Sequence, residues 1–170
     1  AEKNFAFGLP APWRKTQAKK MKTLAAFFLF ACYLSPWAKG ELQAGAVALD
    51  VTPKQFPVLV NGSMTSRSAT GVTDPIYAKA LVLSDGKTEI AIVVVDSCMM
   101  PRPILDEAKP RTAKRTGIPS DHILISATHT HSAPSTLACL GTKADPRYTP
   151  YLVGRIAEAI AVAQKKLQPA

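Results

Sequence analysis

The sequence predicts an α/β fold in which a mixed sheet carries an antiparallel hairpin, then a βαβ unit, then a covering C-terminal helix. Two aliphatic runs, residues 76–84 and 89–95, flank a turn sequence. A helical pattern separates the second run from a third, residues 123–127, and residues 151–167 repeat apolar side chains at helical spacing. A chain of 170 residues has room for one domain or for the opening part of a larger one, and we expect an incomplete domain.

The first expected strand, residues 45–53, alternates small and apolar residues until Pro53, as an edge strand entering a loop does. Residues 61–71 are rich in Ser, Thr and Gly without a helical or strand period, which predicts a loop. A loop of this length in a compact domain is either mobile or part of a site. We interpret Arg67, its only charged residue, as a solvated surface side chain, with a role in a site as the alternative.

The hairpin follows from the turn signal Asp85-Gly-Lys87 between two β-branched and aliphatic runs. The second run is apolar on both faces over residues 90–95, so we expect it in the interior of the sheet. It ends at Asp96, which places a carboxylate where the strand opens into a loop.

A helix is expected over residues 104–116, shortened or kinked by Pro110. Its expected inward-facing residues are Ile104, Leu105, Ala108 and Ala113. Residues 123–127 form the next buried strand, parallel to residues 89–95. Asp96 and His129 would then leave the same edge of neighbouring strands, which predicts a carboxylate within reach of a histidine.

The clearest helix, residues 151–167, follows Pro150 and is expected to cover the sheet and to carry no chemistry. The apolar residues on its predicted inner face are Leu152, Ile156, Ala159, Ile160, Ala163 and Leu167.

The basic charge is concentrated at the N-terminus. Residues 1–40 hold seven Lys and Arg residues and one acidic residue, so they account for +6 of the net charge of +9. The remaining residues carry only +3, and we therefore reject nucleic acid as a partner of the body of the chain.

The N-terminus is organised like an exported precursor. Residues 21–40 combine a basic start, a short apolar run and the small-x-small ending Ala38-Lys-Gly40, the pattern of a secretory signal peptide. An uncleaved anchor is the alternative, and a lipoprotein site at Cys32 fits less well. We expect residues 1–20 to be an upstream non-native or disordered extension, residues 41–170 to be the mature part, and the protein to be secreted or periplasmic.

Export would place Cys98 and Cys139 in an oxidising compartment. Both follow predicted strand ends, so a disulfide is conceivable, and two free or buried thiols are the alternative.

Two of the three histidines, His129 and His131, follow the strand at residues 123–127. We expect the two rings to point to opposite sides, so that one metal ion rarely takes both, and we predict different roles for them. A pair of surface histidines is the alternative. His122 precedes the strand and is interpreted as exposed, so we expect no complete zinc site within the chain.

The segment that contains His129 and His131 also resembles a segment of a known protein family. Ile125-Ser-Ala-Thr-His-Thr-His-Ser-Ala-Pro134 resembles the Ser-Ala-Thr-His-Thr-His-Ser-Gly-Pro segment of the neutral and alkaline ceramidases, zinc-dependent amidases that cleave ceramide to sphingosine and a fatty acid. Residues 45–53, 80–85 and 93–99 resemble further stretches of that family in the same order, and the resemblance covers about residues 44–169 of this chain.

The resemblance implies Zn²⁺ as cofactor, with His129 as a metal ligand and His131 as a catalytic residue that contacts a lipid amide substrate at a membrane surface. Asp96 is expected to be a second catalytic residue that orients the site. The remaining ligands of the family lie further along a longer chain. This sequence is therefore expected to be the N-terminal part of the catalytic domain, to bind zinc weakly and to hydrolyse nothing alone.

The motif departs from the family at Ala133-Pro-Ser135, where the relatives have Gly-Pro-Gly-Gly, and glycine allows closer backbone approach by a substrate. Two alternatives follow. The chain is a degenerate secreted domain with a binding or structural role, or its protein hydrolyses an amide other than a sphingolipid.

Overall fold

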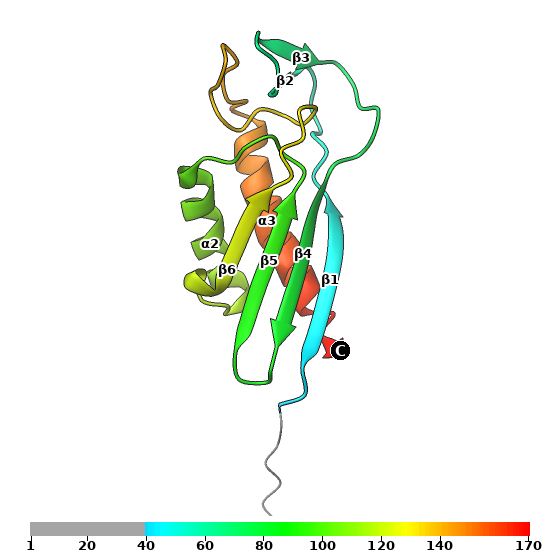
Figure 1. Cartoon of the computed structure of the whole chain (residues 1–170), viewed down its shortest axis with the longest axis vertical. Helices are drawn as coiled ribbons and strands as arrows, with labels where there is room; N and C mark the ends of the chain where they lie inside the picture. Colours follow the sequence, from blue (N-terminus) through cyan, green and yellow to red (C-terminus); the bar gives the residue numbers. More distant parts are fainter. Residues whose placement is uncertain (1–39) are drawn as a thin grey trace, which may run out of the picture. The chain divides into compact units, whose positions relative to one another are not determined.

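A five-stranded mixed sheet forms the centre of the computed structural model, which describes residues 40–170 (Figure 1). The expected extension and signal peptide, residues 1–20 and 21–40, lie outside the described residues except for Gly40. The strand order is β6-β5-β4-β1-β7. The strands span β1 Gln43–Asp50, β4 Tyr77–Ser84, β5 Glu89–Val95, β6 Ile123–Ala127 and β7 Gln168–Pro169. The predicted fold class is confirmed.

The hairpin between β4 and β5 lies where the sequence predicts it, with Ala78 opposite Val95 and Ser84 opposite Glu89. Asp85 shapes the turn because its Oδ1 accepts the backbone N–H of Lys87 at 2.9 Å and of Thr88 at 2.7 Å. These bonds satisfy amides that have no partner across the hairpin.

The predicted βαβ unit is present, since β5 pairs in parallel with β6 after helix α2, Arg102–Thr116. Pro103 lies in the first turn of α2, and Pro110 is inside a helix that continues to Gly117, whose N–H bonds Ala113 O at 2.8 Å. The buried residues of α2 are Ile104, Ala108 and Thr112. Leu105 and Ala113 are only half-buried, because the buried face follows a strict four-residue spacing.

Helix α3, Tyr148–Gln164, packs across the sheet beside α2. It begins three residues before the predicted start because Asp145 Oδ1 accepts the N–H groups of Arg147 and Tyr148, both at 3.0 Å. It ends before Leu167, which leads into β7, whereas the other five predicted inner residues are buried.

Burial of β5 is one-sided. Ala91, Val93 and Val95 are buried under the helices, whereas Ile90 is 41% exposed on the other face. The strand lies in the interior of the sheet, between β6 and β4, as predicted. Its apolar second face is nevertheless not covered, because the helices α2 and α3 form a layer on one face of the sheet among residues 40–170.

A second, two-stranded sheet lies within the region that includes the predicted loop. Strand β2, Val58–Val60, pairs antiparallel with β3, Arg67–Ala69, and an isolated bridge joins Val60 to Pro134. Residues 67–69 are therefore a strand and not loop, and this hairpin is tied to the segment that carries the histidines (Figure 1). Within the part of the chain that the structure describes, no helix has the length and apolar character needed to cross a bilayer.

Candidate metal centre

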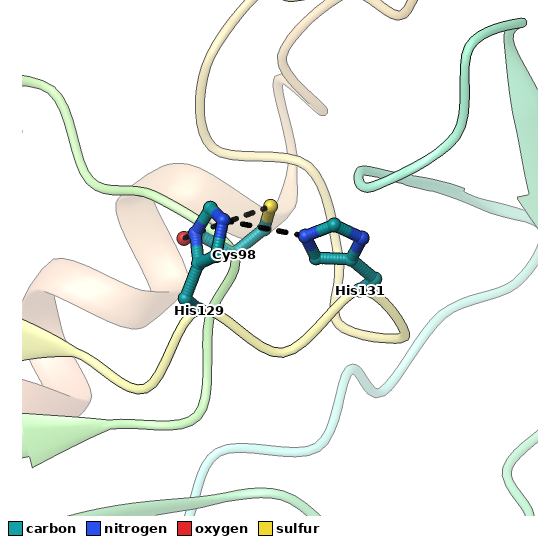
Figure 2. A group of neighbouring side chains, drawn as sticks. All are labelled: Cys98, His129 and His131. Carbon is teal, nitrogen blue, oxygen red and sulfur yellow. Dashed lines mark hydrogen bonds between the residues drawn. The ribbon is translucent and has the colours of Figure 1, made fainter.

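The candidate site lies just beyond the C-terminal ends of β5 and β6. The N–H of Thr128 bonds Val95 O at 2.9 Å, which continues the parallel pairing one step past the strand end. Because these strands are neighbours, the segments that follow them lie side by side and bring Cys98 close to His129 (Figure 2).

The two histidine rings face each other. Their Nε2 atoms are 3.4 Å apart and their ring centroids are 4.9 Å apart. The prediction that the rings point to opposite sides is wrong, because side chains at i and i+2 of an extended segment lie on the same side. The segment is also not extended here, since β6 ends at Ala127 and His129 has a left-handed backbone conformation with φ of 64°.

The proton of His129 can be located from its partner. His129 Nδ1 lies 2.7 Å from the backbone oxygen of Cys98, and a carbonyl oxygen only accepts hydrogen bonds, so Nδ1 carries the hydrogen. In a neutral ring Nε2 then keeps its lone pair free, on the side of His131. This is the arrangement by which outer hydrogen bonds orient metal-binding imidazoles.

Cys98 supplies a third donor atom. Its side chain is 3% exposed, and Sγ lies 4.0 Å from His129 Nδ1. Burial, together with the charge of a nearby Cys139 thiolate, raises the pKa of the Cys98 thiol, so it stays protonated near neutral pH unless a cation stabilises the thiolate. Both Cys98 and Cys139 are free thiols, which decides against a disulfide between them in this structure.

The donor set fits zinc. One ligand atom from each of Cys98, His129 and His131 can be chosen so that all lie within 4.8 Å of one another. Bonds of about 2.0–2.1 Å in tetrahedral geometry place two nitrogen ligands about 3.3–3.4 Å apart, and the two Nε2 atoms are separated by 3.4 Å. Imidazole nitrogen and thiolate sulfur are ligands that zinc prefers.

Asp96 lies near this site without contacting either histidine among the described residues. Its Oδ2 accepts the Tyr77 N–H at 2.9 Å, and its Oδ1 pairs with Lys79 Nζ at 3.1 Å. Its own N–H bonds Tyr77 O at 2.8 Å. Asp96 therefore fixes the end of β5 against β4, two residues before Cys98, and the polar neighbour of His129 is Cys98.

The segment after β2 packs directly on His131. Gly62 has φ of 96°, and a Cβ at this position would lie 2.5 Å from His131 Cα and closer still to the side chain. The Arg67 guanidinium donates to the backbone oxygen of His131 and lies 3.5 Å from that of Asn61. Arg67 is exposed, as expected, but it is not simply solvated, since it joins the hairpin to the histidine segment.

A hollow of about 370 Å³ adjoins this segment. Apolar residues such as Phe56, Val58 and Val60 line part of it, and Ser132 and Pro134 form another part. Neither histidine lines it, so the hollow lies beside the donor cluster. A second hollow of about 310 Å³ lies near Asp145 and Tyr148.

The third histidine is not simply exposed as predicted. His122 ends the short helix η1, Ser120–His122, and is half-buried, with Nδ1 3.0 Å from Glu89 O. It lies before β6, at the opposite end of that strand from His129.

Sequence reasoning found His129 and His131 but missed Cys98, Gly62 and Arg67 as parts of the site. The available signals were the position of Cys98 two residues after Asp96 and the Gly- and Ser-rich composition of residues 61–71, which predicts a site as one of two alternatives.

Comparisons with known proteins support the resemblance. No protein-family model matches the sequence. The solved neutral ceramidase from Pseudomonas aeruginosa superposes with a TM-score of 0.67 and 22% identity, and a ceramidase in complex with C2 with a TM-score of 0.65 and 25% identity. Each match covers 76% of this chain and 22% of the neighbour, so the chain spans about a fifth of those proteins. Residues 40–170 thus have the fold of a part of the neutral ceramidases, as the histidine motif indicates.

Proposed function

We propose that this chain is the N-terminal part of an exported, zinc-dependent amidohydrolase similar to the neutral ceramidases. The observation that carries the proposal is the His129–His131 pair just after β6, beside the end of the parallel strand β5, in a fold shared with ceramidases. His129 is the proposed metal ligand because its Nδ1 donates a hydrogen bond to the Cys98 carbonyl, which leaves the lone pair on Nε2, 3.4 Å from His131 Nε2, for a cation.

Zinc supplies Lewis acidity and lowers the pKa of a bound water in such hydrolases. His131 is exposed and adjacent to His129, which suits its proposed role as the catalytic residue on the substrate side. Asp96 is proposed to act as a positioning residue, because it holds the strand end that carries Cys98.

The proposed substrate is a lipid amide presented at a membrane surface. The apolar part of the 370 Å³ hollow beside Ser132 suits an acyl chain, since ligand pockets combine apolar walls with few polar groups. Because the chain spans 22% of its structural neighbours, we propose that the rest of the site comes from further sequence and that this chain alone hydrolyses nothing. Export through residues 21–40, to the periplasm or the exterior, belongs to the same proposal.

The segment Ala133–Ser135 favours a substrate other than ceramide. The backbone oxygen of Ala133 accepts from Asn61 at 3.3 Å, and the N–H of Ser135 donates to Leu59 O at 2.7 Å. Ala133 and Ser135 are both 0% exposed. Where the relatives have glycines, the backbone of this segment makes hydrogen bonds within the protein instead of facing a substrate. A family member that acts on another amide is therefore the second candidate function, and a degenerate binding domain is the third.

The test uses the longest natural translation product that contains this sequence. It is assayed on a ceramide with a labelled acyl chain and on a simple N-acyl amide, with and without chelator. We expect hydrolysis that requires zinc, is abolished in His129→Ala and persists in His122→Gln, the control at the other end of β6.

Hydrolysis that resists the chelator or survives in His129→Ala would overturn the proposal. A folded protein that hydrolyses no amide would support the degenerate binding domain, and activity on the simple amide alone would support the second candidate.

A further inference from the structure

We propose that two adjacent loops, the tip pair, dock the protein on the surface of a bilayer that contains anionic lipid. The tip pair consists of the connection between β2 and β3, residues 61–66, and the turn at residues 139–142. The inference rests on the lipid substrate of the proposed function and deepens it, because it names the surface through which the site meets a membrane.

The two loops lie side by side at the end of the molecule that carries the histidines. Both lie at the end toward which β5 and β6 point (Figure 1). A Cβ at Gly141 would lie 4.0 Å from the backbone nitrogen of Ser66, so the turn is beside the hairpin. The bridge from Val60 to Pro134 joins the hairpin to the histidine segment. A flat surface that contacts both loops therefore faces the end of the molecule where the site lies.

Each loop of the tip pair carries a large apolar side chain in solvent. Met64 is 78% exposed and Leu140 is 51% exposed. Single exposed apolar residues are common on protein surfaces and need no explanation. Two of them on adjacent loops form a patch, and the backbone at Leu140 adds a second, independent observation.

Leu140 has a backbone conformation that leucine disfavours. Cys139 and Thr142 exchange two backbone hydrogen bonds of 2.9 and 3.0 Å, which close a two-residue turn. The central residues of the turn, Leu140 and Gly141, have φ of 49° and 79°. Turns with two positive φ angles prefer Asn before Gly, because asparagine tolerates this conformation better than a large apolar residue does. Leucine here gains neither a favoured turn conformation nor full burial among residues 40–170, which favours contact with another surface.

The charge around the tip pair favours an anionic partner. Residues 61–73 and 128–144 contain no acidic residue, and they hold the cations Arg67 and Lys143, which are both exposed. Apolar side chains flanked by cations suit the headgroup region of an anionic bilayer, where apolar burial and electrostatic attraction add. A second copy of this chain docked through the same loops would bring like charges together, which opposes a dimer.

The hollow beside the histidine segment gives this docking a use. Arg67, Ser68 and Ala69 of β3 line the hollow of about 370 Å³, so the hairpin that carries Met64 also forms part of its wall. Val72, another residue of the wall, is 48% exposed. Docking through Met64 would hold the hollow proposed for the acyl chain close to the bilayer and shorten the path of a lipid amide through water.

The test is sedimentation of the longest natural translation product that contains this sequence with phosphatidylcholine vesicles, with and without phosphatidylserine. A chelator is present throughout, so that no hydrolysis alters the lipid. We expect binding that is stronger with phosphatidylserine and weaker at high salt. Lys143→Gln should weaken binding to the phosphatidylserine vesicles by about 5-fold, the effect of one basic residue near an anionic surface, and should leave binding to phosphatidylcholine alone unchanged.

The matched variants replace an exposed leucine at either end of the molecule. Leu140→Asn and Met64→Ser should each weaken vesicle binding by about 10-fold, since half or more of each side chain is available for burial. Leu42→Asn should bind like the wild type, because Leu42 is 52% exposed but precedes β1, at the opposite end of the sheet. Circular dichroism checks that each variant is folded.

The stability of Leu140→Asn separates docking from a structural role. Because asparagine tolerates the turn, the midpoint of urea denaturation should stay the same or rise while vesicle binding falls. A lower midpoint would show that Leu140 stabilises the fold, which contradicts the inference.

Absence of vesicle binding by the wild type, or equal binding by Met64→Ser, Leu140→Asn and the wild type, overturns the inference. Dimers of the wild type that either variant dissociates in size-exclusion chromatography also overturn it, because the tip pair would then contact a second copy. Vesicle binding is measured without hydrolysis, whereas the proposed function is tested by zinc-dependent hydrolysis of an amide. The two proposals therefore fail by different measurements.

Discussion

Replacement of Gly62 by alanine should damage the site through His131. The added Cβ would lie 2.5 Å from His131 Cα and closer to its side chain, so one of the two segments must move. The backbone at Gly62, with φ of 96°, also disfavours any side chain. Left-handed strain contributes about 1–2 kcal/mol, and overpacking contributes about 1–3 kcal/mol more. We therefore expect Gly62→Ala to lower the free energy of unfolding by about 2–5 kcal/mol.

Gly86 provides the control. It also has a positive φ, 83°, but an added Cβ there meets nothing within 4 Å. Gly86→Ala should therefore show only the conformational term, about 1–2 kcal/mol. Urea denaturation of both variants, with Co²⁺ titration of each, separates strain from displacement of His131. Equal stability losses in the two variants, with unchanged metal affinity in Gly62→Ala, would refute the view that Gly62 positions His131.

Two further predictions concern buried polar anchors. Asp145→Asn should lower stability at pH 7 by about 1–3 kcal/mol, because an amide NH₂ would face the N–H of Leu59 or Tyr148, which now bond the two carboxylate oxygens. Burial opposes ionisation of Asp145, but its backbone hydrogen bonds hold its pKa below the usual value. The stabilisation is therefore complete above about pH 3.9, the unfolded pKa, and disappears as the pH falls through the folded pKa, so urea denaturation curves of variant and wild type should converge in acid. Asp96→Ala should lower the free energy of unfolding by about 1–3 kcal/mol, because the Tyr77 amide loses its acceptor, and Asp96→Asn, which keeps an acceptor for that amide, should restore most of the loss. A positioning role also requires weaker metal binding, so unchanged metal affinity in Asp96→Ala would show that Asp96 has only a structural role.

The elements of the main sheet could be predicted because local and global signals agree there. The turn at Asp85 and the aliphatic runs on either side define the hairpin within one residue, and residues 123–127 match β6 as predicted. The ends of α3 were less predictable. Its start depends on Asp145, a side chain outside the periodic pattern, which accepts N–H groups of the first turn.

The site was predicted only in part, because its geometry depends on one backbone angle. A positive φ at a residue other than glycine carries no sequence signal, yet His129 adopts one in the segment where its Nε2 lies 3.4 Å from that of His131. The contact of Cys98 with His129 joins positions 31 residues apart and follows from the parallel pairing of β5 and β6. The sequence predicts the Asp96 carboxylate as the polar neighbour of His129, whereas the residue beside His129 is Cys98, two positions later.

The zinc content of the longest natural translation product that contains this sequence tests the central claim most directly. After equilibration with zinc and extensive dialysis, elemental analysis by mass spectrometry should find one zinc ion per wild-type protein and almost none in His129→Ala, with His122→Gln unchanged. A wild-type protein without zinc, or a His129→Ala variant that retains as much zinc as the wild type, would contradict a metal centre at the ends of β5 and β6.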